Sequence, residues 1–340
     1  MNMTHAYLNS PKLIADVGGT NARLVLNTSI GEFSSVRVMQ CEKYDSLSAV
    51  IREYLTDVGE SNVQDAVIAI ATPISGDQVR LTNNHWSFSI EATRQELGLR
   101  TLLVINDFSA LAMSLPYLGE TDISRLDMLG QVRRGVKAVI GPGTGLGVAG
   151  LVPVGNGWRS LPSEGGHVSL SPADPLELEI LKLLWNDYAH VSAERLISGP
   201  GIALLYRTVC QIAGTRPAVD DAAGVVELAT NGGCKSAEQT LSVFSGLLGG
   251  VAGNVALTYG CHGGLYLGGG VLGKLGVMFD SKKFCHRFVA KGRFEGYLEA
   301  IPRYLITTEH PAFIGAAEHL RNHMAQGWTD QLLRQHGYIV

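Results

Sequence analysis

The sequence lacks the features that mark several classes of protein. Its five cysteines stand far apart, so they form neither a regular disulfide framework nor a C-x-x-C pair for zinc. No run of Lys or Arg exceeds two residues and the net charge is −4, so the basic stripe of a nucleic-acid-binding protein is missing. These absences argue against a disulfide-rich protein, a zinc finger and a nucleic-acid partner.

Long apolar runs are missing as well. Residues 1–12 lack the apolar core of a signal peptide, and no segment contains about 18 uninterrupted apolar residues. We therefore expect a cytoplasmic protein without a membrane partner.

Three common motifs of nucleotide-binding proteins and hydrolases are also missing. No segment fits the Walker A pattern G-x-x-x-x-G-K-[ST], and none fits the serine-hydrolase pattern G-x-S-x-G. The dinucleotide pattern G-x-G-x-x-G fails because Leu146 stands at its third glycine position, after Gly141 and Gly143. P-loop, Rossmann and α/β-hydrolase folds are thus disfavoured.

Glycine, by contrast, is abundant, with 41 of the 340 residues against a usual share of about 7%. Residues 12–27 contain an apolar strand, a Gly-Gly-Thr-Asn turn and a second apolar strand, and residues 137–154 repeat this hairpin pattern. Further strands are predicted at 35–39, 63–74, 101–107 and 263–270, and helices at 46–58, 108–115, 175–188, 201–212, 222–230 and 235–259, with a last strand and helix within 302–322. Two halves that each open with a glycine hairpin indicate a duplicated α/β unit.

The glycine turns are candidate phosphate-binding sites. Gly18 and Gly19, like Gly143 and Gly145, leave the backbone N–H groups open to close approach by an anion. A single such turn is often only a tight turn. Two of them, with a third glycine cluster at 268–270, favour phosphate binding.

Polar side chains at three places could bind a hydroxylated ligand. Asn106 and Asp107 follow an apolar strand, where α/β sheets bind ligands, although Asp107 could instead cap the next helix. Glu164 and His167 flank two glycines, which a simple turn would also explain. Glu194 follows Ser192 and could be only a first-turn helix acid. A sugar would need such a set of carboxylate, amide and imidazole partners.

Together, these segments resemble the bacterial glucokinase family from about Leu13 to Arg321. The resemblance is carried, in order, by DVGGTNARLVL, INDF, GPGTGLGVA, LPSEGGHVSLSP, VSAERLISGPG, YLGGGV and KGRF. It implies an α/β fold with two RNase-H-like (actin-like ATPase) domains around a central cleft. The small domain would comprise 1–116 plus 309–326, the large domain 117–308, and residues 327–340 would be a C-terminal tail.

The resemblance also implies a reaction and a role for each motif. The chain would transfer the γ-phosphoryl group of ATP to the 6-hydroxyl of glucose, the first step of glucose use in glycolysis, with Asp107 as the catalytic base. The other sugar ligands would be Asn106, Glu164, His167 and Glu194. ATP would be bound by Ala15, Asp16, Val17, Gly18, Gly19, Thr20, Gly143, Thr144 and Gly145, with Gly269 and Gly270 near the adenosine. Asp16 would reach Mg²⁺ through water, since this ion keeps several of its waters. The resemblance also allows a homodimer.

Several alternatives stay open at this point. The acceptor could be another hexose, such as fructose or mannose, and the donor could be ADP or polyphosphate. A sugar-sensing regulator would need a DNA-binding segment for which residues 1–12 have no room, and a chaperone-like ATPase would lack the acids of the EGGH and AER segments. The cysteine-rich zinc motif of the related repressor-type sugar kinases is absent. Ser163 and Ala15 stand where close relatives often have Gly.

Overall fold

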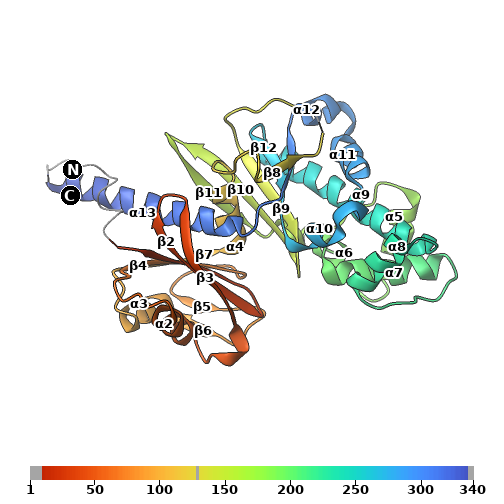
Figure 1. The fold of residues 1–340 in the computed structure, drawn as a ribbon. Coiled ribbons are helices and arrows are strands. Elements are labelled where there is room, and N and C mark those ends of the chain that lie inside the picture. Colours follow the sequence, from red (N-terminus) through yellow and green to blue (C-terminus); the bar gives the residue numbers. More distant parts are fainter. Residues whose placement is uncertain (1–9, 128–129, 336–340) are drawn as a thin grey trace. The chain divides into compact units, whose positions relative to one another are not determined.

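The computed structural model describes residues 10–127 and 130–335, which divide into two compact units (Figure 1). The first unit runs to Leu118 and also includes Gly155–Ser160 and the chain from Glu309 onward. The second comprises Gly119–Val154 and Leu161–Thr308. Each unit has its own sheet and its own hydrophobic core.

The first unit is built on a five-stranded sheet of order β3-β2-β1-β4-β7. Its strands are β1 (Lys12–Val17), β2 (Asn21–Ser29), β3 (Glu32–Gln40), β4 (Asp65–Ile70) and β7 (Thr101–Asn106). The predicted hairpin is β1 and β2, which pair antiparallel, while β1, β4 and β7 run parallel to one another. The predicted strands of this half are therefore confirmed.

Alternating side chains bury both faces of this sheet. Leu13 and its alternate neighbours on β1 pack with α2 (Leu47–Asp57), whereas Ile14 packs on the other face with α4 (Asp107–Ser114) and α13 (Pro311–Gln335). Gly315 of α13 lies so close to the carbonyl of Ala110 on α4 that a Cβ would overlap it. The terminal helix is thus packed firmly into the first unit. A small hairpin of β5 (Gln78–Arg80) and β6 (Ser87–Ser89) leads into α3 (Ile90–Glu96).

The second unit repeats this plan in a six-stranded sheet of order β11-β10-β9-β12-β13-β8. The strands are β8 (Ile123–Arg125), β9 (Lys137–Pro142), β10 (Leu146–Val154), β11 (Gly157–Ser163, of which the part from Leu161 belongs to this unit), β12 (Gly264–Leu267) and β13 (Arg303–Ile306). The hairpin strands β9 and β10 are antiparallel, and β9, β12 and β13 are parallel. The matching order of hairpin and parallel strands confirms the duplicated α/β unit.

The second unit also contains several helices, whose apolar side chains pack with the sheet in its core. They are α5 (Pro175–Leu184), α6 (Ala193–Leu196), α7 (Gly199–Ile212), α8 (Ala222–Asn231), α9 (Lys235–Tyr259), α10 (Gly270–Leu275), α11 (Ser281–Val289) and α12 (Glu295–Glu299). The helix predicted at 235–259 has the same bounds as α9, and its glycines do let a neighbour approach. Gly249 and Gly253 lie against the backbone of Phe284 and Phe288 on α11, where a Cβ would not fit.

Helix α9 is also the one helix of the described chain that is long and apolar enough to cross a membrane. However, 78% of its most apolar window is buried inside the protein. It contributes Leu241, Phe244 and Leu248 to the main core of the second unit. In this fold α9 therefore packs as a core helix.

The structure differs from the predicted elements at several places. α7 begins at Gly199 rather than at residue 201, because the Ser198 side chain caps it by accepting from the Gly201 N–H at 3.1 Å. α13 continues to Gln335, so residues 327–335 of the expected tail are helical. Residues 1–9 and 336–340 lie outside the described residues.

Candidate active site

Three parallel strands of the first unit end at one edge of its sheet. Val17 of β1 lies opposite Ile70 of β4, and Ile70 lies opposite Asn106 of β7. The residues that follow these strands therefore share this edge, which is where ligands bind in α/β sheets. The structure thus brings the first glycine turn and the Asn106–Asp107 pair to the same edge of one sheet.

The first glycine turn, Gly18–Thr20, joins β1 to β2. The Gly18 N–H donates to the Asn21 carbonyl at 3.0 Å, which closes the turn. A Cβ on Gly19 would lie 2.7 Å from the Asn83 carbonyl oxygen, so only glycine fits between the turn and the Asn83 segment. The side chains of Ala15 and Val17 are buried in the core of this unit, so any contact that they make with a nucleotide must come from the backbone.

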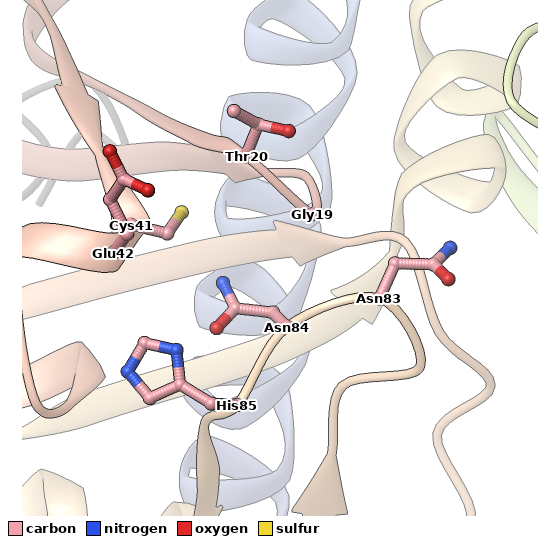
Figure 2. A pocket seen from close by; sticks show the side chains of 7 residues that line it. All are labelled: Gly19, Thr20, Cys41, Glu42, Asn83, Asn84 and His85. Atoms are coloured by element: carbon pink, nitrogen blue, oxygen red, sulfur yellow. The ribbon is translucent and has the colours of Figure 1, made fainter.

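A pocket of about 400 Å³ opens beside this turn (Figure 2). Figure 2 shows its lining from three segments, the turn after β1, the short 3₁₀ helix η1 (Cys41–Lys43) after β3 and the loop between β5 and β6: Gly19, Thr20, Cys41, Glu42, Asn83, Asn84 and His85. The last loop is anchored by Trp86, whose Nε1–H donates to the Tyr44 carbonyl at 2.8 Å. Burial raises the pKa of the Cys41 thiol, which donates to the Gly18 carbonyl at 3.8 Å.

Outside the glycine turn, the residues of this pocket were not predicted from the sequence. A signal was present, because three polar residues, Asn83, Asn84 and His85, directly precede the buried Trp86. Binding residues are often found on loops that a rigid scaffold positions, and the buried Trp86 holds this loop in place.

Asp16 is the one side chain of β1 in the predicted ATP segment that is partly open to solvent, with 25% of its side chain exposed. Burial raises the pKa of its carboxyl, while Arg23, at 3.4 Å, and His310 oppose this rise. A carboxylate that is short of compensating positive charge suits a cation. Mg²⁺ is commonly held by one or two carboxylates, water and phosphate, so Asp16 fits the predicted contact.

The helix after β7 is not capped as the sequence suggested, where Asp107 was the candidate cap. Asn106 is the N-cap of α4, because its Oδ1 accepts from the N–H groups of Phe108 at 3.0 Å and Ser109 at 3.2 Å. The Asp107 carboxylate accepts from the Phe108 N–H as well, at 2.9 Å. Its Nδ2 donates to the Thr72 carbonyl at 3.4 Å, which fixes the amide at both ends. Asp107 is the first residue of α4, where the helix dipole favours a negative charge.

The second glycine turn, Gly143–Gly145, is held by several backbone contacts. The Gly143 N–H donates to the Gly145 carbonyl at 2.8 Å, and the Gly143 carbonyl accepts from Gly199 at the start of α7, also at 2.8 Å. Gly269, with φ at +86°, lies against the carbonyl of Pro142. The predicted phosphate and adenosine segments of this half therefore adjoin each other. Thr144 is exposed at the tip of the turn, and Gly270 opens α10.

The predicted sugar ligands of the second unit also come together. His167 Nε2 lies 3.9 Å from a carboxylate oxygen of Glu164, and His167 Nδ1 lies 3.9 Å from one of Glu194. The segments are joined by the Ala193 N–H, which donates to the Val168 carbonyl at 2.8 Å. The Ser163 hydroxyl accepts from the Gly165 N–H at 2.9 Å and so stabilises the bend before His167.

Each unit therefore contains one glycine turn together with polar side chains suited to a hydroxylated ligand. The first unit groups the turn with Asp16, Asn106 and Asp107, and the second groups it with Glu164, His167 and Glu194. Two sheets that each combine a glycine hairpin with parallel strands define the actin-like ATPase fold.

The chain belongs to the glucokinase family, whose model matches residues 13–323. It is 45% identical over 315 residues to the glucokinase of Chromobacterium violaceum, covering 93% of this chain and 90% of that protein. A glucokinase structure from an Antarctic psychrotroph matches with a TM-score of 0.84 and 38% identity, over 92% of this chain and 99% of that one.

A longer group of relatives is equally similar. The protein named bifunctional protein glk of Paraburkholderia xenovorans is 48% identical over 323 residues, which cover 93% of this chain and 50% of that protein. The chain thus spans about half the length of this curated relative.

Proposed function

We propose that the protein is an ATP-dependent glucokinase, which forms glucose 6-phosphate and ADP in the cytoplasm. The observation that carries the proposal is the position of Asp107 in a chain of this family. This carboxylate shares a sheet edge with a glycine turn, and the neighbouring Asn106 already caps the helix. Asp107 can therefore serve as a base without loss of the cap.

In this mechanism Asp107 accepts the proton of the 6-hydroxyl as the hydroxyl oxygen attacks the γ-phosphorus of ATP. The bond between the γ-phosphorus and the β–γ bridging oxygen breaks, and ADP leaves. Transfer to phosphorus needs mainly positioning and neutralisation of charge, so a single base suffices. The cap and the Thr72 contact fix Asn106, and this restricts the backbone from which Asp107 projects. A fixed backbone keeps the base within reach of the proton, which geometry requires before pKa matters.

The two glycine turns would hold the phosphates of ATP through backbone N–H groups. Neither turn carries a side chain larger than threonine at its tip, so an anion can approach the backbone closely. Gly269 and Gly270 adjoin the second turn and would lie beside the nucleoside. Bound Mg²⁺ would neutralise phosphate charge, and Asp16 is the residue that would hold its hydration shell.

The remaining hydroxyls of the sugar would be bound by the second unit. Glu164 and Glu194 offer carboxylate acceptors, and His167 between them can donate or accept. We propose that this cluster and Asp107 act on the same hexose. A hydroxyl at each sugar position would then have a polar partner, as selection among hexoses requires.

A coupled assay over a panel of hexoses and phosphoryl donors tests this proposal. We expect turnover with glucose and ATP, with much lower kcat/KM for fructose, mannose, ADP and polyphosphate. A higher kcat/KM with another hexose would show that glucose is not the preferred substrate. Equal ATP hydrolysis with and without every hexose would remove the kinase proposal altogether.

A further inference from the structure

The carboxylate of Glu194 contacts both the sugar cluster and the second glycine turn. Its Oε2 accepts from the Leu146 N–H at 2.8 Å, directly after that turn. Its Oε1 lies 3.9 Å from His167 Nδ1 in the sugar cluster. One side chain with 32% of its surface exposed therefore connects the two groups of residues.

Glu194 and the residues that follow it contact the turn at more than one point. A Cβ on Gly145 would overlap the Glu194 carboxylate, so the side chain lies directly against this glycine. The Gly143 carbonyl accepts from the N–H of Gly199, which lies shortly after α6 in the chain. The segment 194–199 thus holds the turn at both of its ends.

We propose that Glu194 is a positioning residue for the nucleotide and couples nucleotide binding to sugar binding. It holds the backbone of Gly145 and Leu146 in the conformation that presents the turn to phosphate. A sugar hydroxyl on Oε1 would fix the carboxylate and so strengthen the hold of Oε2 on the turn. The inference rests on the proposed function for the identity of the two ligands.

The sign of the effect distinguishes positioning from simple electrostatics. Removing a carboxylate beside a phosphate site removes repulsion, which by itself would tighten nucleotide binding. Removing a hydrogen bond that orders the turn would weaken binding instead, because the turn must then be ordered when the nucleotide binds. If Glu194 positions the turn, its removal should weaken nucleotide binding, whereas the loss of its charge alone would strengthen it.

The test compares Glu194→Ala with Glu164→Ala by ADP titration without sugar. Both variants lose a carboxylate of the sugar cluster, but the Glu164 carboxylate lies beside His167 while that of Glu194 binds the turn, so Glu164 serves as the matched control. We expect Glu194→Ala to weaken ADP about tenfold, the scale of one hydrogen bond to a charged group, and Glu164→Ala to leave ADP affinity unchanged. Unchanged or tighter ADP binding by Glu194→Ala would overturn the proposal.

A second variant disturbs the same contact from the other side. Gly145→Ala would push the Glu194 carboxylate away from the turn, because the new Cβ would overlap the carboxylate. We expect weaker ADP binding in this variant and no additional loss when it is combined with Glu194→Ala. Fully additive losses would contradict a shared contact.

Hydrogen exchange of the peptide 141–150 provides a readout that needs no ligand. Faster exchange in Glu194→Ala than in Glu164→Ala is expected if Glu194 orders the turn. Equal exchange would overturn the proposal even if the wild type phosphorylates glucose. Conversely, a protein that fails as a glucokinase but shows this exchange difference would lose the proposed function and keep the positioning role.

Discussion

Asp107 and Asn106 are neighbours with separate roles. The sequence placed both at the end of an apolar strand, but the residue types alone could not decide which one caps the helix, because both are good caps. Asn106 is the cap because its backbone is extended, with φ −67° and ψ 144°, while Asp107 is already the first residue of the helix. Only the folded chain provides this information.

Asp107→Asn tests the role of the carboxylate as a base. We expect kcat to fall by roughly 10²–10⁴-fold, the usual contribution of a positioned base, with little change in glucose affinity because the amide can still bond the hydroxyl. Asn106→Ala is the matched control for the cap and should lower stability by about 1 kcal/mol. A near-normal kcat for Asp107→Asn would place the chemistry on another residue.

Asp16→Asn tests whether the partly buried carboxylate of Asp16 lowers the stability of the fold. Because the folded-state pKa of Asp16 is raised by burial, its ionisation destabilises the fold at every pH above that value. The variant should therefore melt at a higher temperature than the wild type at pH 7, and the difference should fade as the pH falls towards 3.8. We also expect it to lose Mg²⁺-dependent turnover.

Asp65 on β4 provides a control of opposite sign. Burial alone would raise its pKa, but hydrogen bonds from Arg100 and Lys12 bring the pKa below 3.8. The ionised form of Asp65 therefore stabilises the fold at pH values above 3.8, so Asp65→Asn should lower the melting temperature at pH 7. Melting curves from pH 8 to pH 4 that show the same sign for both variants would contradict this account.

At the scale of elements, strong periodic or apolar patterns were sufficient for prediction. The hairpin strands β1, β2, β9 and β10 are long and apolar, and α9 combines helical spacing with 25 residues of length. The short elements were missed for a physical reason. β5, β6 and β8 have three residues each, too few to show a period of two, and α12 has only five. Their conformation is set by the neighbours they pack against.

The packing of α9 on α11 leads to a prediction with an internal control. Gly249 has no room for a Cβ beside the Phe284 backbone, so Gly249→Ala should destabilise the protein by about 1–3 kcal/mol. The adjacent Gly250 has only an Arg287 nitrogen at 3.6 Å, so Gly250→Ala should be neutral or stabilising by up to about 1 kcal/mol. Urea unfolding would reveal the difference, and equal losses in both would contradict close packing at Gly249.

At the scale of the whole molecule, the duplication could be predicted because each half begins with its own glycine hairpin. The grouping of Glu164, His167 and Glu194 could not be read from spacing, since Glu194 lies 27 positions after His167 in the sequence. It depends on the bridge between Ser169 and Ser192 and on the Ala193 hydrogen bond to Val168. The family resemblance supplied this group where local patterns did not.

Phosphoryl transfer by the proposed glucokinase should depend on glucose and end on its 6-hydroxyl. The most direct measurement is a phosphorus NMR time course with ATP, Mg²⁺ and purified protein, recorded with and without glucose. The account predicts that glucose 6-phosphate accumulates in step with ADP, and that inorganic phosphate stays near its initial level. Phosphate release at the same rate without glucose, or a phosphate on another hydroxyl, would contradict it.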